Sequence, residues 1–199
     1  MQLYGCLPYY LILDARLLSA ALAIVEEVPS GEIFLGFNSL GAFASVNHGH
    51  FHGMVTDPGL TLPIERAAKR AIAVRPNQVR IAQLWSYPAA ALLFSSEGLS
   101  LLEIAQAAEG FINILQRENV PPIAVVRRRA VFIGASSRLK PPKLAGAIAS
   151  IELGGRLHAH GEHFSSFTEL DAHEQLAYGT VSRECFDQFT AQYIATLVC

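Results

Sequence analysis

The chain has 199 residues, of which 51% are hydrophobic and only 16% are charged, and its formal net charge is -2. This composition excludes a disordered chain, which combines low hydrophobicity with high net charge, and it lacks the basic excess with which proteins bind nucleic acids. The apolar runs are shorter than the roughly 20 residues of a membrane-spanning helix, and the N-terminus has no basic signal-peptide region. We therefore expect one cytoplasmic domain that binds neither nucleic acid nor membrane, with Cys6, Cys185 and Cys199 as free thiols.

The first half of the chain, residues 1–75, is predicted to hold a helix, an antiparallel hairpin and a second helix. The first helix is rich in Leu and Ala and is ended by Pro29-Ser30-Gly31. Asn38 and Gly41 suit the positive φ of a turn between the two strands. In chain order, the expected elements are a helix over 11–27, strands over 32–37 and 46–55, and a short basic helix over 64–74.

The second half, residues 76–199, is predicted to alternate strands and helices. Its clearest helix lies over 101–117, because Leu102, Ala105 and Ile112 share one face. The expected strands cover 79–84, 89–94, 123–127, 130–133 and 148–157, and the expected helices cover 101–117, 169–178 and 183–197. This order predicts a single α+β domain over 1–199 that is built on an antiparallel sheet.

The most informative segment is Asn47-His48-Gly49-His50-Phe51-His52-Gly53. On a strand, residues two apart face the same way, so the three imidazoles would line one face. Glycines between them would allow a ligand or another backbone to approach closely. Three interpretations stay open on this segment alone: a metal site, a histidine nucleophile that carries a phosphoryl group, or a structural polar patch.

A family resemblance narrows these choices. The stretch from His48 to Met54 resembles the histidine-triad signature, and the stretch from Asn38 to His48 resembles the GDP-L-galactose phosphorylase family, a branch of the histidine-triad superfamily. Later landmarks that resemble this family lie at 62–66, 86–88, 115–121 and 129–133. The resemblance implies a HIT-like antiparallel sheet with flanking helices. Because Met1 lies just before the first matching helix, the N-terminal part of that fold is expected to be shortened.

The resemblance also implies a reaction, namely nucleotidyl transfer at the α-phosphate of a nucleoside diphosphate sugar, as in a GDP-hexose phosphorylase. The matching nucleophile is His50, with His48 orienting it and His52 stabilising the phosphate or relaying a proton. A sugar 1-phosphate would leave, and inorganic phosphate would then take the nucleotide from His50. The expected substrate-binding residues are Asn38, Ser39, Gly41, Ser45 and Asn47. No cofactor and no metal are expected.

Other functions remain open at this point. Transferases of the superfamily usually carry Gln where this chain has His52, whereas hydrolases carry His, so a nucleotide hydrolase with water as acceptor is the first alternative. A metalloenzyme that uses the three histidines and a non-catalytic nucleotide-binding relative are the others. The large apolar fraction predicts a homodimer in which the partner covers the sheet.

The chain has two further clusters of histidine or arginine side chains. His158, His160, Glu162 and His163 are interpreted as an exposed polar loop, in preference to a metal site or a phosphate-binding loop folded over His50. Arg127-Arg128-Arg129 is interpreted as a solvated edge strand, in preference to a nucleotide-binding fork. Trp85 and Tyr87 are expected in the core or an interface rather than stacked on a base.

Overall fold

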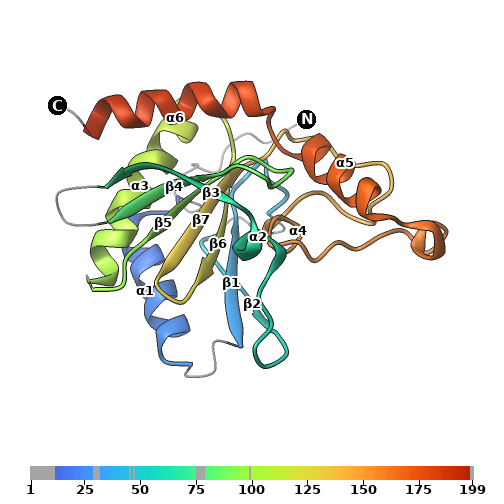
Figure 1. Cartoon of the computed structure of the whole chain (residues 1–199), viewed down its shortest axis with the longest axis horizontal. Coiled ribbons are helices and arrows are strands. Elements are labelled where there is room, and N and C mark those ends of the chain that lie inside the picture. Colours follow the sequence, from blue (N-terminus) through green and yellow to red (C-terminus); the bar gives the residue numbers. More distant parts are fainter. Residues whose placement is uncertain are drawn as a thin grey trace, which may run out of the picture.

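The computed structural model describes residues 12–28, 32–44, 46, 48–74, 79–98 and 100–197. Within them, seven strands form one antiparallel sheet in the order β2-β1-β6-β7-β5-β4-β3 (Figure 1). The strands are β1 (Ile33–Asn38), β2 (His52–Val55), β3 (Lys69–Val74), β4 (Arg80–Leu84), β5 (Ala91–Ser95), β6 (Pro122–Arg127) and β7 (Ala130–Ala135). The predicted α+β class with an antiparallel sheet is therefore confirmed.

Helices cover both faces of this sheet (Figure 1). The longer ones on the first face are α1 (Ala15–Glu26), α3 (Leu101–Arg117) and α6 (Arg183–Leu197). The second face carries α2 (Pro63–Arg66), α4 (Ser150–Leu153) and α5 (Glu169–Gly179), with the 3-10 turn η2 (Phe164–Ser166) in the segment before α5. Among the described residues, none of the helices is both long and apolar enough to cross a membrane.

Alternation along the strands divides the core into two layers. In β1, Leu35 and Phe37 point to the first face, where they join the cluster built by α1, α3 and α6. Phe34 points to the second face and joins a separate cluster with α2 and α4. The alternation means that neighbouring residues of β1 and β2 belong to different layers, and this fixes which face receives the histidines.

Helix α3 has the predicted bounds because its capping residues and its buried apolar face both favour a helix over this range. Ser100 caps it, accepting a hydrogen bond at Oγ from the Glu103 N–H (3.4 Å), while Glu103 Oε2 accepts one from the Ser100 N–H (3.1 Å). Phe111 lies on its buried face, 5.7 Å from the ring of Tyr193 on α6. The predicted helix over 183–197 also has the bounds of α6.

Three predicted elements are wrong. The strand expected over 46–55 begins only at His52. The helix expected over 64–74 stops at Arg66, and residues 69–74 form β3, an edge strand whose exposed Lys69 and Arg70 resemble a helix surface in sequence. The strand expected over 148–157 is instead the single turn α4, which Gly154 ends before Gly155 turns the chain with a φ of 96°.

Candidate functional site

The histidines enter the sheet at its β2 edge. His52 is the first residue of β2 and lies opposite Gly36 of β1. Phe51 points to the first face, where its ring lies 5.6 Å from that of Phe37. His52 therefore faces the second face, as does Met54 two residues further on. The three histidine rings were predicted to lie on one face of a strand. The rings of His50 and His52 do lie together, although His48 and His50 precede the regular strand.

Two contacts define the state of His50. Its Nδ1 lies 3.0 Å from the His48 carbonyl oxygen, and its Nε2 lies 3.2 Å from Nε2 of His52. Because a carbonyl oxygen only accepts, Nδ1 of the neutral His50 ring must carry the hydrogen, and Nε2 then holds the lone pair. His52 Nε2–H is the donor toward that lone pair. In this arrangement the lone pair of His50 Nε2 faces the Nε2–H group of His52.

Solvent reaches this group of rings. His48 is exposed, whereas His50 and His52 are half-buried. The ring centroids of His50 and His52 are 4.8 Å apart, and those of His48 and His50 are 5.5 Å apart. A phosphate could therefore approach His50 without any rearrangement of the core.

The predicted substrate-binding residues lie at the end of β1, where Asn38 is the last residue, and in the connection that leads from β1 to the histidines. Asn38 and Ser39 are buried: Asn38 Oδ1 accepts a hydrogen bond from the Ser150 N–H (2.7 Å), and Ser39 Oγ donates one to the Pro122 carbonyl (2.8 Å). Gly41 has a φ of 83°, which a residue with a side chain rarely adopts. These contacts give Asn38, Ser39 and Gly41 a positioning role in the free protein, and their contact with substrate stays a prediction.

The other two predicted substrate-binding residues, Ser45 and Asn47, lie outside the described residues. Phe43 precedes them with a φ of 61° and a half-exposed ring. A non-glycine residue in this left-handed region is uncommon and marks a conformation that its surroundings hold in place.

Sequence reasoning missed Ser150, the first residue of α4. Its side chain is fully buried over Gly36, and a Cβ placed on Gly36 would lie 2.6 Å from the Ser150 Cβ. Among the described residues, the Ser150 hydroxyl has no hydrogen-bond partner. Since Gly36 is the partner of His52, α4 lies over the strand β1 that pairs with the histidine strand β2. No local pattern could reveal this contact, because residues 150 and 38 are 112 positions apart.

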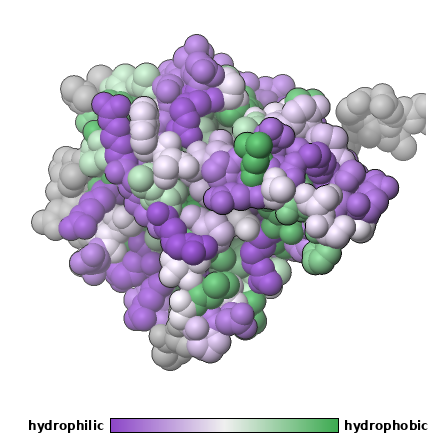
Figure 2. Space-filling view, turned by 45° about the vertical axis from the view of Figure 1, so that its right-hand side comes forward, coloured by the Kyte–Doolittle hydropathy of each residue, from purple (hydrophilic) through white to green (hydrophobic). Residues whose placement is uncertain are grey.

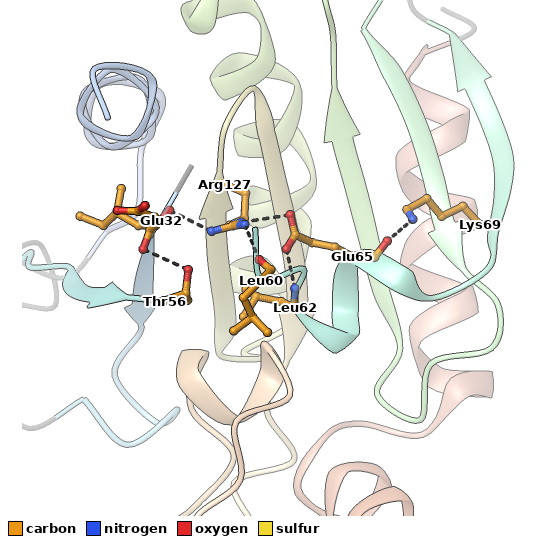
Figure 3. A network of polar contacts seen from close by, with 8 residues as sticks. Glu32, Thr56, Leu60, Leu62, Glu65, Lys69 and Arg127 are labelled. Atoms are coloured by element: carbon orange, nitrogen blue, oxygen red, sulfur yellow. Dashed lines mark hydrogen bonds and ion pairs between the residues drawn. The ribbon is translucent and has the colours of Figure 1, made fainter. Parts of the chain in front are cut away.

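The interpretation of Arg127 as part of a solvated edge strand is wrong. Arg127 ends β6, an inner strand, and its Nε donates to Glu65 Oε1 at 3.0 Å (Figure 3). It also donates to the backbone carbonyls of Ile33 (3.1 Å) and Leu60 (3.3 Å). This clamp holds α2 and the loop after β2 against the sheet.

A cavity of about 490 Å³ lies on the second face, between α2, α5 and the turn from β4 to β5. Arg66, Tyr87, Leu157 and His173 are among its lining residues. The Tyr87 hydroxyl donates to the Leu153 carbonyl (2.8 Å), and burial raises the pKa of this phenol. Tyr87 is thus a core residue, as predicted.

The described part of the chain contains no group of three or more His, Cys, Asp or Glu side chains arranged to hold a metal ion.

The seven-stranded antiparallel sheet with helices on both faces is a HIT-like fold. The structure resembles yeast Ap4A phosphorylase Apa2 in complex with Ap4A, with a TM-score of 0.66 and 14% identity over 85% of this chain and 64% of that one. It also resembles Apa2 in complex with AMP, with a TM-score of 0.61. At this level of identity the likeness shows the fold, and it confirms the predicted HIT-like architecture.

Two family models match the chain: the GDPGP1-like N-terminal domain over residues 3–54 and the GDPGP1-like C-terminal domain over residues 63–199. The chain therefore belongs to the GDPGP1-like family. It is 28% identical to GDP-L-galactose phosphorylase 1 of Arabidopsis thaliana, in a match that covers 100% of this chain and 47% of that relative. It is 33% identical to GDP-D-glucose phosphorylase 1 of Xenopus laevis over 58% of this chain and 27% of that one. The chain spans about half the length of the first of these relatives.

Proposed function

We propose that the chain catalyses nucleotidyl transfer at the α-phosphate of a nucleoside diphosphate sugar, through a nucleotide bound covalently to His50. The observation that supports this most directly is the hydrogen bond between His50 Nδ1 and the His48 carbonyl, which leaves the lone pair on Nε2. The relatives, which are named as phosphorylases of GDP-L-galactose and GDP-D-glucose, support the substrate class.

In the first half-reaction, His50 Nε2 forms a bond to the α-phosphorus. The bond from that phosphorus to the bridging oxygen breaks, and the sugar 1-phosphate leaves with the electron pair. The imidazole then carries positive charge, which the His48 carbonyl stabilises through Nδ1–H. His52 Nε2–H, which faces His50 in the free protein, turns to a phosphate oxygen in this scheme.

In the second half-reaction, an oxygen of inorganic phosphate forms a bond to the same phosphorus. The bond between phosphorus and His50 Nε2 breaks, and its electron pair returns to the ring. The products of the complete cycle are a nucleoside diphosphate and a sugar 1-phosphate.

A nucleotide hydrolase is the second candidate, and the position of His52 favours it. His52 Nε2 lies 3.2 Å from the nucleophile, and once His52 has left this hydrogen bond, the tautomer with its lone pair on Nε2 could take a proton from a water that attacks the intermediate. The two functions share His50 and the covalent intermediate, and they differ only in the acceptor.

Incubation with GDP-glucose and GDP-galactose, with and without inorganic phosphate, tests the proposal. We expect the protein mass to rise by one guanylyl group when phosphate is absent, and the adduct to disappear when phosphate is added. His50→Ala should form no adduct and should lose activity by more than about 1,000-fold. Binding of these nucleotides without adduct or turnover would instead indicate a non-catalytic relative.

We also propose that the protein is a cytoplasmic homodimer. Figure 2 shows hydrophobic residues in small separate groups among hydrophilic ones on the face that it presents. Light scattering at micromolar concentration tests the dimer, because a mass close to the 21.6 kDa of one chain would contradict it.

A further inference from the structure

Ser150, the first residue of α4, carries a buried hydroxyl group that forms no hydrogen bond to the residues that the structure describes. Its relative exposure is 0%. Buried polar groups without a partner are rare in native proteins, because such a group loses its hydrogen bonds to water and gains none in return. A partner that becomes available in another state of the site would account for the Ser150 hydroxyl.

The position of Ser150 on the sheet is fixed by its backbone and by a glycine. Its N–H donates to Asn38 Oδ1 at 2.7 Å, which ties the start of α4 to the end of β1. A Cβ built on Gly36 would have Ser150 Oγ as its nearest neighbour and would lie 2.6 Å from the Ser150 Cβ. The hydroxyl therefore occupies the space that a side chain of residue 36 would fill, and it can change direction by rotation about the Cα–Cβ bond of Ser150.

The side chain of His52 projects beside this space. Gly36 and His52 lie directly opposite each other in the antiparallel pair of β1 and β2. Side chains at such opposite positions point to the same face, and their Cβ atoms lie about 4.5–5.5 Å apart. Because residue 36 is glycine, no side chain of that residue stands between the Ser150 hydroxyl and His52. The two groups are neighbours on the second face of the sheet.

The ring of His52 has one nitrogen that is not used in the free protein. Its Nε2 lies 3.2 Å from His50 Nε2 and donates to it, so Nδ1 of the neutral His52 ring holds a lone pair. Within the described ranges, this Nδ1 has no hydrogen-bond partner. A serine hydroxyl can donate to such a nitrogen when the ring is neutral, and it can accept from Nδ1–H when the ring is protonated.

We propose that Ser150 is a positioning residue for His52, and that its hydroxyl donates to His52 Nδ1 when His52 turns from His50 to the phosphate. This inference rests on the proposed function. The hydrogen bond keeps the hydrogen of His52 on Nε2, the atom that meets the phosphate oxygen, because the partner of one imidazole nitrogen sets the state of the other. The His48 carbonyl does the same for His50. Ser150 itself neither touches the substrate nor transfers a proton.

The tautomer of His52 can be measured without substrate. In His50→Ala, His52 loses the acceptor that it has in the free protein, so the state of its ring then reports the contact with Ser150. The measurement uses 15N-labelled histidine at about pH 9, above the pKa of about 6.5 of a free imidazole. We expect the hydrogen on Nε2 of His52 in His50→Ala, and we expect the two ring nitrogen signals to move toward each other in His50→Ala/Ser150→Ala. Identical His52 signals in the two proteins would overturn the inference.

The kinetic test uses Ser150→Ala, which removes the hydroxyl and keeps the Cβ that packs over Gly36. We expect the guanylyl adduct to form about 5- to 10-fold more slowly at saturating nucleotide sugar, the effect of losing one hydrogen bond, with an unchanged KM. The midpoint of urea denaturation should not fall, because the hydroxyl that is lost has no partner in the free protein. An unchanged rate of adduct formation would overturn the inference, as would a lower midpoint together with a raised KM.

Ser96→Ala is the matched control. Ser96 is also a buried serine, and it follows β5 at the end of the sheet opposite to Asn38, where Ser95 pairs with Ala130. Its rate of adduct formation and its KM should equal those of the wild type. A wild type that forms no adduct would overturn the proposed function, and the tautomer measurement would still decide whether Ser150 sets the state of His52.

Discussion

The Nε2 atoms of His50 and His52 lie 3.2 Å apart, and the backbone sets the direction of the hydrogen bond between them. The His48 carbonyl requires the hydrogen on Nδ1 of His50, so His52 is the donor. The lone pair that would attack a phosphate is therefore covered by an N–H group in the free protein. In the proposed reaction, substrate must displace His52 from this contact, and a phosphate oxygen offers His52 a charged acceptor in exchange.

His52→Gln is expected to change the choice of acceptor. Glutamine keeps an N–H donor for the phosphate but has no nitrogen that takes a proton from water. We expect hydrolysis of the nucleotide sugar to fall by roughly 10- to 100-fold relative to its phosphorolysis. Product analysis with and without phosphate gives this ratio. His163→Gln serves as the control for a histidine outside the triad, and an unchanged ratio in His52→Gln would show that His52 has no role in hydrolysis.

The sequence was sufficient to predict the elements that carry strong local patterns. The apolar face of 101–117 is a local feature, and it forms α3 with the expected bounds. The spacing of the histidines brings His50 and His52 together, although His48 and His50 precede the strand on which all three were expected. Strand β3 was missed because its exposed Lys69 and Arg70 hide the alternation of a strand. Helix α4 has only four residues, too few for a helical period to show.

The surroundings of the site could not be predicted for a different reason. Ser150 contacts Asn38 and Gly36 across more than a hundred residues of sequence, and Arg127 meets Glu65 across 62. Such contacts depend on the order of strands in the sheet, and a single sequence contains no local pattern that fixes that order. The roles of Asn38 and Ser39 in holding α4 and β6 were hidden for this reason.

Gly36→Ala is expected to disturb the layer above the triad. The new methyl group would lie 2.6 Å from the Ser150 Cβ, so α4 must shift, at a cost of about 1–3 kcal/mol in the free energy of unfolding. Gly53→Ala is the matched control, since its methyl group would meet only the end of Leu35 at 3.5 Å. Urea denaturation measures both changes. The double variant Gly36→Ala/Ser150→Gly should recover part of the loss, and equal losses in the two alanine variants would contradict the proposed packing.

Arg127→Met is expected to destabilise the fold far more than Arg128→Met. Arg127 is 10% exposed and neutralises Glu65, which is 22% exposed, so its removal leaves a largely buried carboxylate without its cation. The expected loss is about 3 kcal/mol. Arg128 is 54% exposed, and its contact with Glu26 is 3.5 Å, so the loss there should stay below about 1 kcal/mol. Similar midpoints of urea denaturation for the two variants would refute this interpretation of the clamp.

Tyr87→Phe is expected to change how stability depends on alkaline pH. Burial raises the pKa of the Tyr87 phenol above the value of about 10 that it has in the unfolded chain. The folded state therefore holds this proton after the unfolded state has lost it, so the contribution of Tyr87 is complete below pH 10 and decreases as the pH rises above that value. At pH 8 the variant should be less stable by about 1 kcal/mol, because the hydrogen bond to Leu153 is lost. Between pH 10 and 11 this difference should narrow, since phenylalanine does not ionise and the other tyrosines are the same in both proteins. A stability difference that stays constant from pH 8 to 11 would mean that the phenol of Tyr87 titrates alike in the folded and unfolded chains.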